Sequence, residues 1–308
     1  MADAPVIALT DVVKRYGTRT AVDGVTLDVR PGEMFGLIGP DGAGKTTTLR
    51  LVCGLLRADA GSVRLLGVDP ARDRTVATCA IGYLSQRFSL YGDLSIDENI
   101  EFFARVHGVR DFGERRTRLL RLTGLEPFRG RLAARLSGGM KQKLALACTL
   151  VHEPRVLVLD EPTTGVDPVS RREFWKLLAE FLAGGLTILF ATPYLDEAER
   201  CDRVALLNAG RVLALDVPAR LQQGVPGVTV EVIATPARRA LQVARDLIGP
   251  SRVQLFGDRL HVRVDGNTAV PALAERLRGA GLEVASARAI TPSLEDVFIE
   301  IVSAEVPS

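Results

Sequence analysis

Several common features are scarce in this sequence, and each absence excludes a class of protein. The 39 basic and 37 acidic residues leave a net charge of only +2, so no excess of positive charge would draw the chain to nucleic acid. The four cysteines, Cys53, Cys79, Cys148 and Cys201, are far apart and form no C-x-x-C pair, which argues against a zinc site or a disulfide framework. We expect buried thiols in a reducing compartment.

Long apolar runs are also missing. The longest uncharged stretch, 181–195, has 15 residues and includes two glycines and a proline, whereas a membrane-spanning helix needs about 20 apolar residues. The first residues, Met-Ala-Asp-Ala-Pro, lack the basic start and the apolar core of a signal peptide. The sequence therefore predicts a cytoplasmic protein that does not itself cross a membrane.

The composition, by contrast, is that of a globular protein, with 47% hydrophobic and 25% charged residues over a length of 308, which predicts two domains. We expect the first domain to span residues 1–222. From residue 6 to about 216 it alternates short apolar runs with helical stretches, a pattern typical of an α/β fold built partly on a parallel sheet. The expected strands are 6–13, 21–29, 34–38, 62–66, 81–84, 156–159, 187–190 and 204–207. The uninterrupted apolar runs at 156–159 and 187–190 predict central strands covered on both faces.

Residues 223–308 are expected to form a second, smaller domain. The segment 222–227, Gln-Gln-Gly-Val-Pro-Gly, breaks the periodicity and marks the boundary. The pattern then predicts strand 228–233, helix 236–248, strands 252–256 and 259–264, helix 268–280 and strand 282–289, which is the order of an α+β ferredoxin-like unit. His261 stands alone on an alternating strand, so we interpret it as a structural or surface histidine.

The motif G-x-x-x-x-G-K-[ST] follows the apolar run 34–38 and opens a helical stretch over 46–56. It consists of Gly39, Pro40, Asp41, Gly42, Ala43, Gly44, Lys45 and Thr46. The glycines let backbone N–H groups curl round a phosphate, and the helix N-terminus adds its partial positive charge. Lys45 would reach the β- and γ-phosphates, and the Thr46 hydroxyl would bind Mg²⁺. The sequence thus predicts a site for a nucleoside triphosphate.

Two carboxylates, Asp160 and Glu161, end the apolar run 156–159. The carboxyl end of a central parallel strand faces the ligand crevice of the sheet, so we expect Asp160 to join the Mg²⁺ shell. We expect Glu161, one residue further on, to act as the general base that polarises the attacking water. An acidic pair at a strand end is common by itself, but together with the phosphate loop it indicates nucleotide hydrolysis.

A second glycine-containing helix start comprises Leu136, Ser137, Gly138, Gly139, Met140, Lys141 and Gln142. Ser137 suits the N-cap, and the glycines leave amides available to another anion. Together with Tyr16, the phosphate loop, Gln86 and the segment 159–163, Leu-Asp-Glu-Pro-Thr, this order of motifs resembles the nucleotide-binding subunits of ABC transporters over about residues 5–220. The resemblance implies a P-loop ATPase core with a helical subdomain at about 87–152.

The same resemblance implies roles for further residues. Tyr16 corresponds to the aromatic residue that stacks on adenine, and Thr47 extends the ATP-binding loop. Gln86 corresponds to the catalytic glutamine that touches Mg²⁺ and water and senses the membrane subunit. The segment 137–140 would cap the γ-phosphate held by a second such domain, and Asp167 corresponds to the loop that links the two sites. ATP would then hold two domains together.

One position departs from the family pattern. The switch histidine, which would contact the γ-phosphate, corresponds to Pro193, and proline has neither a side-chain donor nor an acceptor. We therefore predict a site that binds ATP and hydrolyses it slowly, with Thr192 or Tyr194 as partial substitutes. A second, different ATPase domain with its own histidine would carry the working site, completed by the Ser137 segment of this chain. A heterodimer is thus favoured, and a homodimer remains an alternative.

The chain also resembles the first half of tandem ATPases of the YbhF type, and its segment 292–298 resembles the tail of exporter ATPases of the daunorubicin-resistance class. This implies the ATP-binding subunit of a type-2 exporter, peripheral on the inner face of the cell membrane through separate permease subunits. The alternatives are a largely non-hydrolysing regulatory subunit, favoured by Pro193, and an importer ATPase, disfavoured by the tail. An ABC protein of ribosomes or DNA is disfavoured because the chain shows no second ATPase domain, coiled-coil arm or zinc cysteines.

Overall fold

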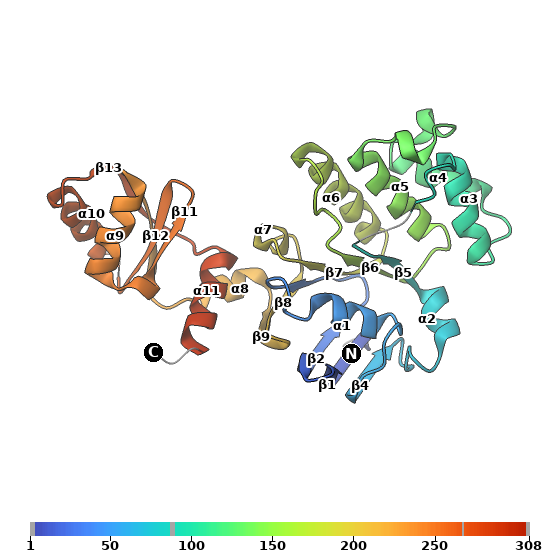
Figure 1. Cartoon of the computed structure of the whole chain (residues 1–308), viewed down its shortest axis with the longest axis horizontal. Helices are drawn as coiled ribbons and strands as arrows, with labels where there is room; N and C mark the ends of the chain where they lie inside the picture. The colour runs from blue at the N-terminus through green and yellow to red at the C-terminus, as the bar shows by residue number, and fades with distance from the viewer. Residues whose placement is uncertain (1–3, 87–89, 267, 306–308) are drawn as a thin grey trace. The chain divides into compact units, whose positions relative to one another are not determined.

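The chain folds into two compact units, and the boundary between them in the sequence lies after residue 215. A computed structural model describes residues 4–86, 90–266 and 268–305 (Figure 1). One unit is Met1–Leu215 and the other is Asp216–Ser308. The division precedes the boundary expected at residue 222, because helix α8 (Pro218–Gln223) packs against α11 (Leu294–Glu305) within the second unit.

A six-stranded sheet forms the centre of the first unit, in the order β5-β6-β7-β3-β8-β9. Its strands are β5 (Ile81–Leu84), β6 (Val156–Asp160), β7 (Thr187–Thr192), β3 (Met34–Ile38), β8 (Arg203–Asn208) and β9 (Arg211–Asp216). The pairs from β5 to β8 are parallel. Every residue of β6 and β7 is buried, which confirms the two central strands predicted from their apolar runs. Strand β9 was not predicted.

A second, antiparallel sheet of β1 (Ile7–Tyr16), β2 (Arg19–Val29) and β4 (Ala60–Leu65) lies on the other side of helix α1 (Lys45–Val52) (Figure 1). Side chains of both sheets and of α1 share one buried core, so the helix that follows the phosphate loop is held from two sides. The helix ends at Val52, four residues before the predicted end, because Gly54 adopts a left-handed conformation with φ +68°.

Helices gather beyond the β5 edge and around the sheet. They are α2 (Arg74–Ala80), α3 (Ile96–Val106), α4 (Gly113–Leu122), α5 (Gly138–Leu150), α6 (Pro168–Ala183) and the short α7 (Leu195–Ala198). A capping box starts α3: the Ser95 hydroxyl accepts from the Glu98 amide, and the Glu98 carboxylate accepts from the Ser95 amide. Helices α3 and α4 pack on α5 and form the helical part expected at 87–152, of which residues 87–89 lie outside the described chain.

The second unit has the predicted ferredoxin-like order of elements. Its strands β10 (Val228–Thr235), β11 (Val253–Phe256), β12 (Arg259–Val264) and β13 (Glu283–Ile290) form an antiparallel sheet in the order β11-β12-β10-β13. Helices α9 (Ala237–Ile248) and α10 (Ala269–Gly279) share its buried core. His261 Nδ1 on β12 lies 3.0 Å from the Asp296 carboxylate on α11, which agrees with a structural histidine.

The thiols only partly match the expectation. Cys148 and Cys201 are buried and Cys53 is half-buried, but Cys79, near the end of α2, is exposed, so the prediction of buried thiols was wrong there. Across the described residues no group of three or more His, Cys, Asp and Glu side chains is arranged to hold a metal ion. Nor does any helix in the described ranges have both the length and the hydrophobicity required to cross a bilayer.

Candidate nucleotide site

The phosphate loop occupies the turn between β3 and α1, where glycine is a steric requirement. A Cβ added at Gly39 would lie 2.1 Å from the carbonyl oxygen of Leu207 on β8. Gly44, the N-cap of α1, has φ +101°, and a Cβ there would lie 2.4 Å from the carbonyl oxygen of Ala21 on β2. Backbone atoms of both sheets therefore lie in close contact with the loop, which leaves no room for a side chain at these two glycines.

Lys45 is the first residue of α1, and its side chain is 4% exposed. Its Nζ donates to the carbonyl oxygens of Gly39, at 2.7 Å, and Pro40, at 3.0 Å, and lies 3.8 Å from Glu161 Oε1. Burial lowers the pKa of Lys45, while the charges of Glu161, Asp41 and Asp160 act in the opposite direction. The loop thus holds a desolvated cation with only partial compensation, which suits a phosphate group.

Asp160, at the end of β6, receives hydrogen bonds on both carboxylate oxygens. Thr46 Oγ1 donates to Oδ1 at 2.9 Å, and the Tyr83 hydroxyl on β5 donates to Oδ2 at 3.3 Å. Burial raises the pKa of Asp160, and the hydrogen bonds from Thr46 and Tyr83 oppose that shift. A hydroxyl and a carboxylate in contact are oxygen ligands of the kind Mg²⁺ prefers, so these residues fit the predicted ion. The sequence reading missed Tyr83, which orients the carboxylate.

Glu161 follows directly and is placed by its backbone. Its φ of +51° turns the chain out of the strand, and its amide donates to the Ala191 carbonyl oxygen at 2.8 Å. Gln86 Nε2 donates to Glu161 Oε2 at 2.9 Å. A carboxylate beside the phosphate loop, hydrogen-bonded to an amide side chain, is arranged to accept a proton from water.

Lys45, Thr46 and Glu161 line a cavity of about 330 Å³. It is lined by Tyr16, Arg19, Ala21, Asp41, Gly42, Gly44, Lys45, Thr46, Thr47 and Glu161. Tyr16 is 47% exposed, and the Lys14 ammonium lies 5.9 Å from its ring centre. Arg19 adds a cation that the sequence reading did not identify, and its Nη2 lies 3.1 Å from the position of a Cβ at Gly42. In the sequence, only the nearness of Arg19 to Tyr16 indicates that Arg19 could line the nucleotide site.

The predicted signature segment lies elsewhere, at the start of α5. Ser137 is its N-cap, and its hydroxyl accepts from the Met140 amide at 3.3 Å. Leu136 and Gly139 are buried, and a Cβ at Gly139 would lie 2.2 Å from Ser170 Oγ. Within the described part of the chain, no residue of 136–142 lines the nucleotide cavity. The described structure therefore gives this segment no part in the nucleotide cavity of its own chain.

Asp167, predicted to link two sites, is the N-cap of α6. Its carboxylate accepts from the amides of Val169, at 3.1 Å, and Ser170, at 3.0 Å. Hydrogen bonds from Ser170 and from these amides lower the pKa of Asp167. The Val169 side chain beside it is exposed.

Pro193 directly follows β7 and is half-buried. The two hydroxyls considered as substitutes for the missing histidine differ in surroundings. Thr192 is 1% exposed and its Oγ1 donates to Glu197 Oε2 at 2.6 Å, so that hydroxyl is already engaged within the core. Tyr194 is 40% exposed, and the Arg171 guanidinium lies 5.0 Å from its ring centre.

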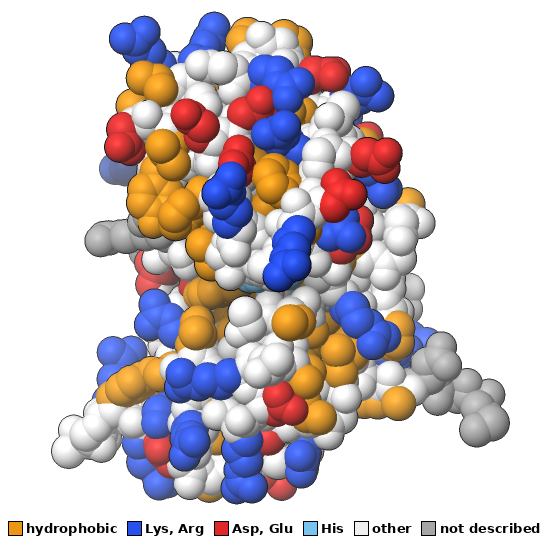
Figure 2. Space-filling model, turned by 90° about the vertical axis from the view of Figure 1, so that its right-hand side faces the viewer, with side chains coloured by type: hydrophobic (Ala, Val, Ile, Leu, Met, Phe, Trp, Pro, Cys, Tyr) orange, Lys and Arg blue, Asp and Glu red, His pale blue; other side chains and the backbone are white. Residues whose placement is uncertain are grey.

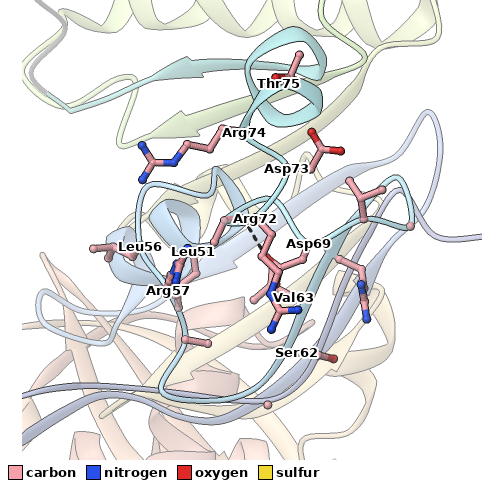
Figure 3. A pocket seen from close by; sticks show the side chains of 16 residues that line it. Leu51, Leu56, Arg57, Ser62, Val63, Asp69, Arg72, Asp73, Arg74 and Thr75 are labelled. Carbon is pink, nitrogen blue, oxygen red and sulfur yellow. Dashed lines mark hydrogen bonds and ion pairs between the residues drawn. The ribbon is translucent and has the colours of Figure 1, made fainter.

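A larger hollow of about 980 Å³ lies between β4 and α2 (Figure 3). Its charged lining residues are Arg57, Arg64, Arg72, Arg74, Asp69 and Asp73. Figure 2 shows Lys and Arg side chains over both halves of one face of the molecule, with Asp and Glu side chains among them. Asp69 pairs with Arg72 at 3.3 Å, and none of the predicted site residues lines this hollow in the described chain, so it is distinct from the nucleotide site.

Comparison with protein families finds a match for each of the two units. Residues 22–164 match the family described as ABC transporter, and residues 221–302 match that described as ATP-binding protein DrrA1-3-like, C-terminal domain. The probable multidrug ABC transporter ATP-binding protein YbhF of Escherichia coli K12 is 41% identical over 98% of this chain. The match covers 52% of YbhF, so the chain spans about half the length of that relative.

Two other relatives match along nearly their whole length. Nod factor export ATP-binding protein I of Burkholderia pseudomallei 1710b is 40% identical over 99% of both proteins. Daunorubicin resistance ATP-binding protein DrrA3 of Streptomyces coeruleorubidus is 36% identical over 98% of this chain and 96% of its own. The solved dimeric structure of MJ0796, a bacterial ABC transporter cassette, has a TM-score of 0.61 at 27% identity, covering 68% of this chain and 98% of that one.

These matches confirm the resemblance inferred from the motifs and the P-loop ATPase fold of the first unit. The order of the motifs, the sheet that carries them and the relatives all indicate the same family. The chain belongs to the ATP-binding proteins of ABC transporters.

Proposed function

We propose that this chain is the ATPase subunit of an ABC exporter and acts with separate permease subunits at the inner face of the cell membrane. The observation that carries the proposal is the cluster of Lys45, Asp160, Glu161 and Gln86 around the phosphate loop. Export is supported by one relative, the Nod factor export ATP-binding protein I, and by the DrrA-like second unit.

Each residue of the site has a separate proposed role in ATP hydrolysis. Lys45 and the loop amides bind the β- and γ-phosphates, and the Tyr16 ring stacks on adenine. Thr46, Asp160 and Gln86 would hold Mg²⁺, which would supply positive charge to the phosphate oxygens. Glu161 Oε2, oriented by Gln86 at 2.9 Å, accepts the proton of the attacking water.

Two ATPase domains are needed for a complete site under this proposal. The 136–142 segment lies outside the cavity lining of its own chain, and the Asp167 turn and Val169 are exposed at the start of α6. We propose that Ser137 and its neighbours complete the site of a second ATPase domain, with Asp167 between the two sites. A partner that carries its own switch histidine makes the pair a heterodimer.

The site built on this chain's own loop is proposed to bind ATP and hydrolyse it slowly. Pro193 offers no hydrogen bond to the γ-phosphate, and the neighbouring Thr192 hydroxyl is bonded to Glu197. The same observation supports a second candidate function, a regulatory subunit for which ATP is a structural ligand.

Steady-state ATP hydrolysis by the purified chain at saturating MgATP tests the proposal, with Glu161→Gln as the blank. ATP binding with turnover close to the blank is the expected result. Turnover at ordinary rates would instead mean that Pro193 is tolerated and that a homodimer suffices. Failure to bind ATP would contradict the assignment of the site itself.

A further inference from the structure

Glu197, on the short helix α7, is a buried carboxylate that collects hydrogen bonds from three separate segments. Its side chain is 1% exposed. Oε1 accepts from Thr163 Oγ1 at 2.5 Å, from Arg171 Nε at 2.8 Å and from Trp175 Nε1 at 3.3 Å, while Oε2 accepts from Thr192 Oγ1 at 2.6 Å. A buried charge is retained only when its lone pairs are satisfied in this way. The four bonds therefore fix the positions of all their donors together.

Two of these donors adjoin the nucleotide site. Thr163 stands two residues after Glu161 and is 4% exposed. Thr192 is the last residue of β7, and its carbonyl oxygen accepts from the amide of Gly39, the first residue of the phosphate loop, at 3.4 Å. A shift of the phosphate loop or of the Glu161 turn would therefore move Thr192 or Thr163, both of which donate hydrogen bonds to the Glu197 carboxylate.

The other two donors lie on α6, one and two turns after its N-cap Asp167. Arg171 and Trp175 project from the same side of this helix, four residues apart, and both bind Glu197 Oε1. Burial acts to lower the pKa of Arg171, but the charges of Glu197 and Asp196 outweigh it and raise the pKa. The ion pair therefore ties the orientation of α6, and with it the exposed Asp167 turn, to the carboxylate.

We infer that Glu197 is a positioning residue that transmits nucleotide binding from the phosphate loop to α6 and its Asp167 turn. This inference rests on the proposed nucleotide site. Pro193 has no side-chain group that could respond to a γ-phosphate, so a response of this segment must pass through its backbone and through Thr192. Among the described residues, Glu197 is the side chain that joins Thr192, Thr163 and α6 through hydrogen bonds.

The neighbouring Asp196 provides a matched control. It binds the same guanidinium, with Oδ2 2.9 Å from Arg171 Nη2, but its side chain is 71% exposed. Asp196→Asn removes a charge and an ion pair from Arg171 and leaves the buried bonds to Thr163, Thr192 and Trp175 in place. Any effect specific to Glu197→Gln is therefore not a general consequence of weakening Arg171.

Trp175 makes the inference measurable, because it is the only tryptophan in the chain and its indole N–H contacts Glu197. Tryptophan emission of the full chain is recorded during titration with the Mg²⁺ complex of a non-hydrolysable ATP analogue. Nucleotide affinity is measured on the same samples by equilibrium dialysis. In the wild type and in Asp196→Asn we expect a saturable change in emission that follows occupancy.

Glu197→Gln is expected to bind the analogue with a Kd within about threefold of the wild type and to lose most of the emission change. A full emission change in this variant, or bound nucleotide without any change in the wild type, would overturn the inference. Absence of binding to the wild type would instead contradict the proposed function. Should Glu197→Gln fail to fold, Thr192→Val and Thr163→Val each remove one donor and keep the ion pair, and an unchanged emission response in both would equally count against the inference.

Discussion

Pro193→His tests whether a missing hydrogen-bond donor limits hydrolysis at this site. Thr192 pairs with Ile38 in the register of β7 and β3, and its carbonyl oxygen accepts from the Gly39 amide at 3.4 Å. The backbone of residue 193 therefore follows directly on a residue that contacts the phosphate loop. A histidine there supplies a ring N–H donor where proline supplies none.

The magnitude follows from the surroundings of position 193. One preorganised donor to a developing oxyanion contributes about 10²–10³ to kcat. Because the side chain at 193 is half-buried and not enclosed, solvent screens part of the interaction, and we expect an increase of about 10- to 100-fold. This corresponds to about 1.4–2.7 kcal/mol of transition-state stabilisation.

The assay is steady-state phosphate release at saturating MgATP, with the Glu161→Gln rate subtracted. Tyr194→His is the matched control, since it introduces the same ring one residue further on, at an exposed position that faces Arg171. ATP affinity is measured on the same preparations to exclude a binding effect. Equal turnover of Pro193→His and the wild type, with ATP bound by both, would refute the reasoning.

Three further outcomes follow from the site. Lys45→Ala should abolish ATP binding in equilibrium dialysis, because the phosphates lose the buried cation that faces them, and binding close to that of the wild type would remove Lys45 from the site. Tyr16→Ala should weaken ATP binding by about 1–3 kcal/mol, the range for stacking of a base on an aromatic ring, and an unchanged Kd would count against stacking. In a complex with a second ATPase domain, Ser137→Arg should lower turnover while this chain's own ATP affinity stays constant; the reverse pattern would place Ser137 in its own chain's site.

Much of the site could be read from the sequence because its parts are contiguous. The spacing from Gly39 to Thr46 already implies the turn between a strand and a helix, and the structure places it between β3 and α1. The uninterrupted apolar run 156–159 implied a covered parallel strand, so the position of Asp160 and Glu161 at the sheet's carboxyl edge followed. Period-two alternation likewise predicted the strands of the second unit.

The sequence also erred where local patterns leave more than one solution. An apolar run continues to residue 56, yet a left-handed Gly54 ends α1 at Val52. The exposure of Cys79 depends on which side of α2 packs against the core. A helix of seven residues is too short for its hydrophobic periodicity to show which side that is. These are limits of periodicity within short segments.

Tertiary structure alone decided the contacts that orient the site. Tyr83 donates to Asp160 across 77 residues of sequence, and Glu197 gathers donors that lie up to 34 residues away. Such pairings depend on which strands become neighbours in the sheet and on where α6 packs, and neither hydrophobic period nor spacing in one sequence encodes a distance between remote residues. The chemical groups of the site were therefore fixed by contiguous sequence, while their orientation came from the packing of segments that are distant along the chain.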